Sequence, residues 1–176
     1  MAKTIWTIGH STRAWDDFVV LLKHHGIRAL ADVRSFPGSR RHPHFGREAM
    51  AAALPAAGIA YTWRPELGGR RKALPDSPNT AWRHPNFRGY ADYMDTPAFA
   101  EALAALEKDA RKTPTAYMCS EAVWWRCHRG MISDALKARG WEVLHITDEK
   151  APKPHPFTPV ARVENGALTY REARLL

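Results

Sequence analysis

Cysteine is scarce in this chain of 176 residues, which contains only Cys119 and Cys127. Two cysteines cannot build the disulfide framework of a small secreted protein, and a reducing compartment keeps them as thiols. Long apolar runs are also missing, since no segment approaches the roughly 20 residues that span a membrane. The first residues, MAKTIWTIGHS, lack the basic, apolar and small-residue regions of a signal peptide. We therefore expect a cytoplasmic protein with no membrane partner.

Acidic residues are outnumbered, because 26 lysines and arginines face 18 aspartates and glutamates and leave a net charge of +8. This excess favours an anionic partner such as a nucleic acid or a nucleotide, although a basic surface without any partner has the same charge. Seven tryptophans favour the partner, because exposed aromatic side chains among basic residues can stack on bases. The alternative is that most of these tryptophans lie in the core. The composition predicts no oligomeric state.

Alternating strand and helix patterns predict an α/β fold. The β-branched segment 4–10 and the segment 27–34 predict two buried strands, with a helix between them that Ser11 or Thr12 caps and Gly26 ends. A strand, a helix and a second strand in this order predict parallel pairing. The remaining strands are expected at 59–65, 115–120 and 141–147, with helices at about 47–57, 90–109 and 131–139. A break at Pro97 is the alternative for the helix at 90–109.

The expected architecture is a single α/β domain with a mainly parallel sheet flanked by helices, in a Rossmann-like three-layer arrangement. Its core covers residues 4–147, and residues 148–176 form a C-terminal extension. The first part of this extension is too rich in proline for a helix or a central strand. Its second part contains Asn165 and Gly166, a pair typical of a tight hairpin turn.

Polar side chains follow the predicted strands, where ligands bind in parallel α/β sheets. Each strand is followed or closed by such groups: Gly9, His10 and Ser11; Asp32 and Arg34; Glu66, Gly68 and Gly69; Cys119 and Glu121; and His145. Because the carboxyl ends of parallel strands share one edge of the sheet, the sequence predicts a site there.

The motifs at these positions resemble the family called domain of unknown function 488. They are Thr7–Ser11 (TIGHS), Asp32–Arg34 (DVR), Leu67–Gly69 (LGG), Phe87 with Tyr90, Cys119-x-Glu121, Cys127–Arg129 (CHR) and His145–Ile146. The resemblance covers about residues 4 to 147. Many family members have an acidic residue and a proline between the glutamate and the second cysteine, where this chain has Val123–Arg126. The resemblance implies an α/β fold and marks site residues, but it implies no activity.

Two carboxylates are the candidates for acid–base catalysis. Glu121 is flanked by Ala122, Val123 and two tryptophans, and burial among them would fit it for general acid or base work. Asp32 is expected at the same edge of the sheet, and two carboxylates on either side of a glycosidic bond can hydrolyse it. The alternative for Asp32 is a salt bridge with Arg34 at the end of the strand.

Cys119 is the candidate nucleophile, because a thiol beside Arg129 or at a helix start would ionise easily. The alternative is a small buried side chain, a common fate of free cysteine. Cys127 precedes Met131 by four residues and Ala135 by eight, so we expect it on the core face of a helix.

Metal binding by the two cysteines and His128 is not favoured, because structural zinc sites usually pair cysteines two to four residues apart. A site completed by His10 or His145 stays open. We assign neither a metal nor a cofactor.

Anion binding is expected at the start of the helix that follows Cys127, where free backbone N–H groups and Arg129 favour a phosphate or carboxylate. The alternative is that Arg129 pairs with Glu121. Trp82 and Phe87 lie in a long polar loop and are candidates for stacking on a displaced base. The expected substrate contacts are His10, Ser11, Arg34, Gly68, Gly69, Trp82, Phe87, Tyr90, His128 and Arg129.

The function that these patterns favour is an enzyme that hydrolyses an N-glycosidic or similar bond in a nucleic acid or nucleotide, as a DNA glycosylase does in DNA repair. One alternative is a nucleic-acid binding module without catalysis. The other is a thiol- or metal-dependent protein.

Overall fold

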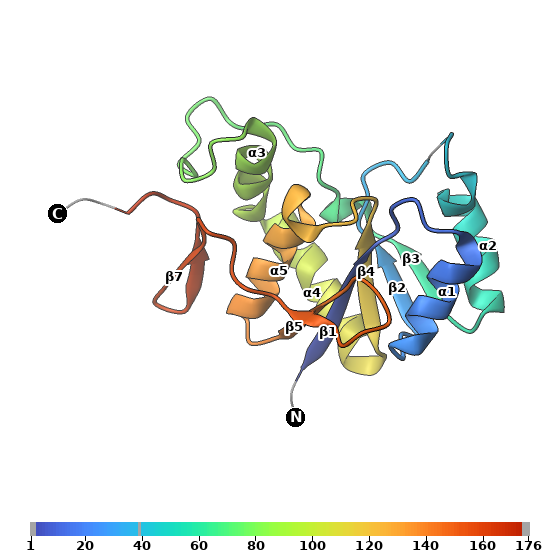
Figure 1. Ribbon diagram of the computed structural model, residues 1–176. Coiled ribbons are helices and arrows are strands. Elements are labelled where there is room, and N and C mark those ends of the chain that lie inside the picture. Colours follow the sequence, from blue (N-terminus) through green and yellow to red (C-terminus); the bar gives the residue numbers. More distant parts are fainter. Residues whose placement is uncertain (1–2, 39, 174–176) are drawn as a thin grey trace.

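A six-stranded sheet runs through the centre of the computed structural model, which describes residues 3–38 and 40–173 (Figure 1). The strand order is β3-β2-β4-β1-β5-β6, and every neighbouring pair is parallel except β5 with β6. The strands are β1 (Thr4–Gly9), β2 (Ala29–Asp32), β3 (Ala60–Trp63), β4 (Thr115–Cys119), β5 (Glu142–Ile146) and β6 (Lys153–Pro154). The predicted α/β fold with a mainly parallel sheet is confirmed.

Helices cover both faces of the sheet and give three layers (Figure 1). On one face Ile8 and Met118 pack in a core that includes side chains of α1 (Trp15–His24) and α2 (Arg47–Ala56). On the other face lie α3 (Pro85–Met94), α4 (Pro97–Lys112) and α5 (Arg129–Ala138), over a core that includes Ile5 and Tyr117. Successive strand residues point to opposite faces, so one strand supplies both cores. Single 3-10 turns lie at Pro43–Phe45, Pro65–Leu67 and Trp124–Arg126.

The segment 90–109, predicted as a helix with a break at Pro97 left open, is two helices. The first begins earlier, at Pro85, after His84 accepts a hydrogen bond from the backbone N–H of Asn86. The second begins at Pro97, and the hydroxyl of Thr96 caps it by accepting from Phe99 N at 3.3 Å. Proline suits the first position of a helix and not its interior, so Pro97 starts a new helix instead of kinking one.

The predicted cap of α1 by Ser11 or Thr12 is wrong. The residue before α1 is Ala14, which makes no side-chain capping bond. Ser11 lies in a turn with φ of 49°, directly after the first strand. This turn places Ser11 at the edge of the sheet instead of at the helix.

The C-terminal extension forms the hairpin that its turn residues predict. β7 (Arg162–Glu164) pairs with β8 (Ala167–Thr169), and Asn165 and Gly166 both have positive φ, 51° and 78°. Two positive φ angles are the signature of the tight turn that Asn-Gly favours. Before this hairpin, the proline-rich part adds only the two residues of β6 at the edge of the sheet.

Among the described residues, the helices include none with the length and apolar character needed to cross a membrane.

Candidate active site

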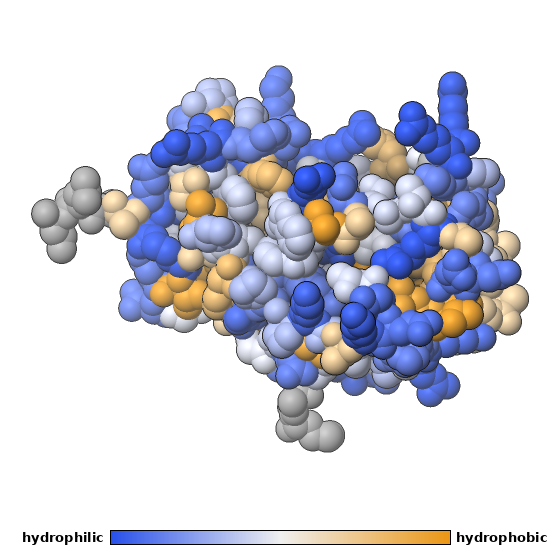
Figure 2. All heavy atoms as spheres, in the orientation of Figure 1, coloured by the Kyte–Doolittle hydropathy of each residue, from blue (hydrophilic) through white to orange (hydrophobic). Residues whose placement is uncertain are grey.

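A pocket of about 1030 Å³ lies at the carboxyl ends of β1, β2 and β4. The loops after these strands line it, together with the loop after β3 and the start of α3. Hydrophilic side chains cover the upper edge of the molecule, to which these loops rise (Figure 2). Four of the five segments expected to meet at this edge do meet there. The fifth, with His145, lies behind the pocket.

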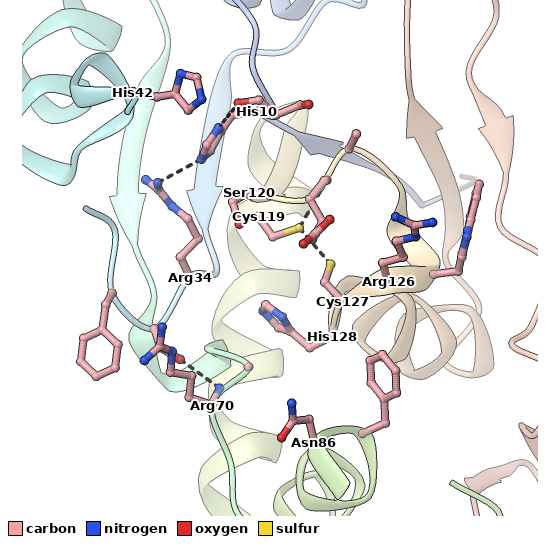
Figure 3. Close-up of a pocket in the computed structure, with 18 of the residues that line it drawn as sticks. His10, Arg34, His42, Arg70, Asn86, Cys119, Ser120, Arg126, Cys127 and His128 are labelled. Atoms are coloured by element: carbon pink, nitrogen blue, oxygen red, sulfur yellow. Dashed lines mark hydrogen bonds between the residues drawn. The ribbon is translucent and has the colours of Figure 1, made fainter. Parts of the chain in front are cut away.

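The two cysteines face each other in this pocket, with 2.9 Å between their sulfur atoms (Figure 3). Cys119 ends β4 and is buried, whereas Cys127 is partly buried. The prediction that Cys127 lies on a helix core face is wrong, because α5 begins only at Arg129. Cys127 instead lies in the short turn before α5, which directs its side chain back toward Cys119.

Of the two thiols, Cys119 loses its proton first. Burial raises the pKa of Cys119, but the hydrogen bond from Cys127 and the charge of Arg129 outweigh it and lower the pKa to about 7. The same hydrogen bond, with burial, raises the pKa of Cys127 well above its ordinary value. At neutral pH the pair is therefore poised between a neutral state and one with a Cys119 thiolate that accepts from the Cys127 thiol.

Arg129 is buried beneath this pair and does not line the pocket. Its guanidinium donates to the carbonyl oxygen of Glu121 at 2.8 Å and to Thr7 Oγ1 at 3.1 Å. Its Nε has no hydrogen-bond partner within the described part of the chain. These bonds place the arginine against the backbone of Glu121 and not against its carboxylate, and they leave it no position from which to hold an anion in the pocket. Its charge acts on the thiols instead.

A chain of hydrogen bonds extends from Thr7 into the interior. Thr7 Oγ1 lies 2.6 Å from His145 Nδ1, His145 Nε2 lies 2.8 Å from His155 Nδ1, and His155 Nε2 lies 2.8 Å from Asp134 Oδ1. Because the Asp134 carboxylate only accepts, His155 donates to it from Nε2. Burial lowers the pKa of His145 strongly, which keeps its ring neutral. Residue spacing gives no sign of this chain, since its members come from four distant segments.

Asp32 is buried and does not line the pocket. Its carboxylate accepts from Arg34 Nε at 2.9 Å, from Arg34 Nη2 at 2.7 Å and from the hydroxyl of Tyr61 at 2.6 Å. The salt bridge named as the alternative for Asp32 is thus present. It fixes the guanidinium of Arg34, which does line the pocket and donates from Nη1 to His10 Nε2 at 3.3 Å.

His10 lies in the pocket wall as a neutral ring. Arg34 can only donate, so His10 Nε2 accepts, and Nδ1 donates to the carbonyl oxygen of Ser11 at 2.8 Å. Burial is the main cause that lowers the pKa of His10, to about 4. Phe45 stacks on the ring with centroids 4.3 Å apart. Ser11 itself lines the pocket, as predicted for both residues.

His128 lies beside the cysteines and lines the pocket (Figure 3). Its Nε2 is 2.7 Å from the carbonyl oxygen of Val33 and donates to it, which leaves Nδ1 as an acceptor. Burial lowers the pKa of this histidine to about 4. A Cβ atom at Gly69 would lie 2.5 Å from His128 Nδ1, and one at Gly68 would lie 2.4 Å from Ser35 Oγ. Gly69 lines the pocket, and the two glycines let their loop approach the site closely.

Glu121 lines the pocket as expected, but its side chain is exposed. The burial among tryptophans that would suit it for acid–base work is absent. The Trp124 ring stacks on His145 with centroids 4.9 Å apart, and Trp125 is 59% exposed. Both rings therefore turn away from covering the carboxylate.

The outer wall of the pocket combines positive charge with aromatic rings. Arg70 and Arg126 join Arg34, whereas Glu121 is the one acidic residue in the described lining. The aromatic side chains there are Phe36, Phe87 and Trp125.

Two of the predicted aromatic contacts lie outside this lining. Tyr90 is buried and donates to Leu67 O at 2.8 Å, and Trp82 packs on Phe87 and Tyr170. Phe36 and Trp125 were not expected in the site. The position of Trp125 between the two cysteines in the sequence could have indicated a place in the site. No feature of the sequence indicates one for Phe36.

Within residues 3–38 and 40–173, no group of three or more histidine, cysteine, aspartate or glutamate side chains is arranged to hold a metal ion. The zinc site that the sequence left open would use His10 or His145. Each of these rings already has both nitrogens in hydrogen bonds within the protein.

Residues 14–136 match the sequence model of a family described as "Domain of unknown function DUF488". This match confirms the resemblance read from the motifs. Neither the curated proteins nor the solved structures contain a significant match to the chain.

Proposed function

The chain belongs to the DUF488 family, whose description assigns no activity, and we propose from the site itself that it is a thiol-dependent enzyme. Cys119 is the nucleophile, and the substrate is a nucleotide or a base of a nucleic acid. The observation that carries this proposal is the buried Cys119 thiol in the pocket, 2.9 Å from Cys127 and above the charge of Arg129. A thiolate available near neutral pH is the form in which cysteine attacks carbon.

The proposed step is a nucleophilic substitution. The Cys119 thiolate attacks an electrophilic carbon of the substrate, and a sulfur–carbon bond forms. The bond from this carbon to the leaving group breaks, and the leaving group departs with the electron pair and takes a proton from water. The hydroxide so formed attacks the same carbon, the sulfur–carbon bond breaks, and Cys119 leaves as the thiolate, which completes the turnover. Cys127 stabilises the thiolate before the attack, because its S–H donates to the Cys119 sulfur.

The lining supports the choice of substrate. Arg70 and Arg126 add positive charge to the lining, where Glu121 is the one acidic residue, and His128 adds an acceptor, Nδ1, on a ring without charge at neutral pH. Phe87 and Trp125 offer flat surfaces on which a base can stack. A pocket of about 1030 Å³ has room for a ligand of nucleotide size.

The test is a search for a covalent adduct. The protein is incubated with alkylated and otherwise damaged nucleotides and oligonucleotides, and adducts are located by intact mass and peptide mapping. We expect an adduct at Cys119 that is absent in Cys119→Ser and unchanged in Ser120→Ala, a neighbouring substitution in the same lining. Turnover of a substrate by Cys119→Ser at the wild-type rate would end the proposal.

Hydrolysis at an N-glycosidic or similar bond is the second candidate, supported by Glu121 in the lining. The usual mechanism needs two carboxylates, and the pocket offers only Glu121, because Asp32 is hydrogen-bonded to Arg34 and Tyr61. Base release that Glu121→Gln abolishes and Cys119→Ser leaves intact would favour hydrolysis over the thiol mechanism. The same damaged oligonucleotides serve for this comparison.

A further inference from the structure

Cys127 has a supporting part in the proposed substitution, yet its sulfur lies closer to Cys119 than any ordinary non-bonded contact between two sulfur atoms. The two thiols share a hydrogen bond at 2.9 Å, and the backbone N–H of Arg129 points at the Cys127 sulfur from 3.4 Å. Two sulfurs of a disulfide lie about 2.05 Å apart, so closing the bond requires an approach of less than 1 Å. Cys127 lies between a single 3-10 turn and the start of α5, where the backbone has few regular bonds to break.

We propose that Cys119 and Cys127 form a redox-active dithiol that reduces small hydroperoxides and becomes an intramolecular disulfide. Cys119 is the sulfur that is oxidised first, and Cys127 is the sulfur that resolves the oxidised product. This activity goes beyond the proposed function: it uses the same Cys119 thiolate but needs neither a nucleotide nor any other part of the outer wall.

The first step is attack of the Cys119 thiolate on the nearer oxygen of the hydroperoxide. A sulfur–oxygen bond forms, the O–O bond breaks, and the distal oxygen leaves with the electron pair. The leaving hydroxide or alkoxide takes the proton of the Cys127 thiol, whose sulfur lies 2.9 Å from the attacking one. The products are a sulfenic acid on Cys119, a thiolate on Cys127, and water or an alcohol.

In the second step the Cys127 thiolate attacks the sulfur of the Cys119 sulfenic acid. A sulfur–sulfur bond forms, the sulfur–oxygen bond breaks, and hydroxide leaves and is protonated by water. Two electrons have passed from the two sulfurs to the peroxide. A dithiol reductant returns the pair to thiols by thiol–disulfide exchange and is itself oxidised to a disulfide.

The groups around the two sulfurs favour a thiolate. Arg129 lies beneath both and favours negative charge on them. From the sheet, Thr7 and the ring of His145 are neutral, and from the pocket side His128 and His10 are neutral at physiological pH. The exposed carboxylate of Glu121 is the acidic group of the lining. Cys119 lines the pocket with 2% of its surface exposed, and hydrogen peroxide is small enough to reach its sulfur there.

The experiment treats the fully reduced chain with a small molar excess of hydrogen peroxide in the absence of any nucleotide. Thiols are counted with a maleimide under denaturing conditions, and the products are identified by peptide mapping. We expect wild type to lose both thiols, to lose two hydrogen masses, to remain a monomer on a non-reducing gel, and to recover both thiols with dithiothreitol. Cys127→Ser should stop at a sulfenic acid on Cys119 that dimedone traps, and Cys119→Ser should keep its remaining thiol.

Three outcomes would overturn the proposal: survival of both thiols, oxidation of Cys119 to a sulfinic acid without a disulfide in wild type, or a disulfide only between chains. Circular dichroism of each variant shows that it is folded, and the wild-type result alone decides whether the disulfide forms. The adduct test above is carried out with reduced protein, so a failure of peroxide reduction leaves the proposed function standing. Absence of an adduct likewise leaves the disulfide result intact.

Discussion

Thr7 connects the guanidinium of Arg129 to the ring of His145. Its hydroxyl oxygen accepts from Arg129 Nη1 at 3.1 Å and lies 2.6 Å from His145 Nδ1. All three side chains are buried. The arginine beneath the cysteines is thus held from the far side of the pocket by a hydrogen-bonded chain that ends at Asp134.

Replacing Thr7 by valine should therefore destabilise the protein although the two side chains have almost the same shape. The change removes one acceptor and one donor and leaves buried polar atoms of Arg129 and His145 without partners. We expect the free energy of unfolding to fall by about 1–3 kcal/mol. Urea unfolding measures this loss.

Thr4→Val is the matched control, because Thr4 is on the same strand and its hydroxyl makes only an exposed bond to Glu142. Its effect should stay within about 0.5 kcal/mol. Equal losses in Thr7→Val and Thr4→Val would show that the buried chain contributes nothing to stability.

The thiol of Cys119 should react as a thiolate with a midpoint near neutral pH. Its pKa is lowered to about 7, so alkylation by iodoacetamide should rise with pH and reach half of its maximum near pH 7. Cys127→Ala removes the hydrogen bond to the thiolate and should move this midpoint toward about 8.5, the value of a free cysteine. The rate of Cys119 alkylation, followed by mass spectrometry across pH, measures both midpoints. A wild-type midpoint already at the free value would contradict the described arrangement.

The sheet and most helices are predictable from the sequence because apolar periodicity reports burial directly. β1, for example, is a segment rich in β-branched residues that pairs with β4 on one side and β5 on the other. The break between α3 and α4 is harder to predict, since Pro97 is compatible with a kink as well as with a start. Local caps decide between the two, and here Thr96 acts as one.

The site is predictable only in part, because spacing along the chain does not say which way a side chain points. His10, Arg34 and Cys119 reach the pocket as the topology requires. Cys127 does not follow the helical spacing, because the helix starts two residues later. Arg129 points inward to backbone carbonyls, a partner that no sequence motif encodes.

The close approach of Gly69 to His128 predicts a specific effect on the site. An added Cβ would lie 2.5 Å from Nδ1, so Gly69→Ala should displace the imidazole and cost about 1–3 kcal/mol of stability. Gly38 also lines the pocket, but a Cβ there has open space, which makes Gly38→Ala the control. Urea unfolding and the pH profile of Cys119 alkylation measure the effect. If both variants behave like wild type, the loop does not press on His128 in solution.

Buried neutral histidines should make the fold sensitive to mild acid. Burial is the main cause that lowers the pKa of His10 and of His128 to about 4, against about 6.5 in an unfolded chain. As pH falls below about 6.5, the unfolded chain binds protons that the folded protein cannot, so the free energy of unfolding decreases until the folded pKa is reached. Each such histidine contributes a slope of about 1.4 kcal/mol per pH unit in that range.

Urea unfolding at pH 7, 6 and 5 measures this slope. His128→Gln retains a donor for Val33 O but removes one titrating ring, so it should flatten the dependence of stability on pH by the share of one histidine. Gly38→Ala removes no titrating group and should leave the slope as in wild type. A stability that is constant from pH 7 to pH 5 would mean that these rings take up protons at the same pH in the folded protein as in the unfolded chain. Burial would then not lower their pKa values, and in mild acid the neutral acceptor assigned to His128 Nδ1 would have to be withdrawn.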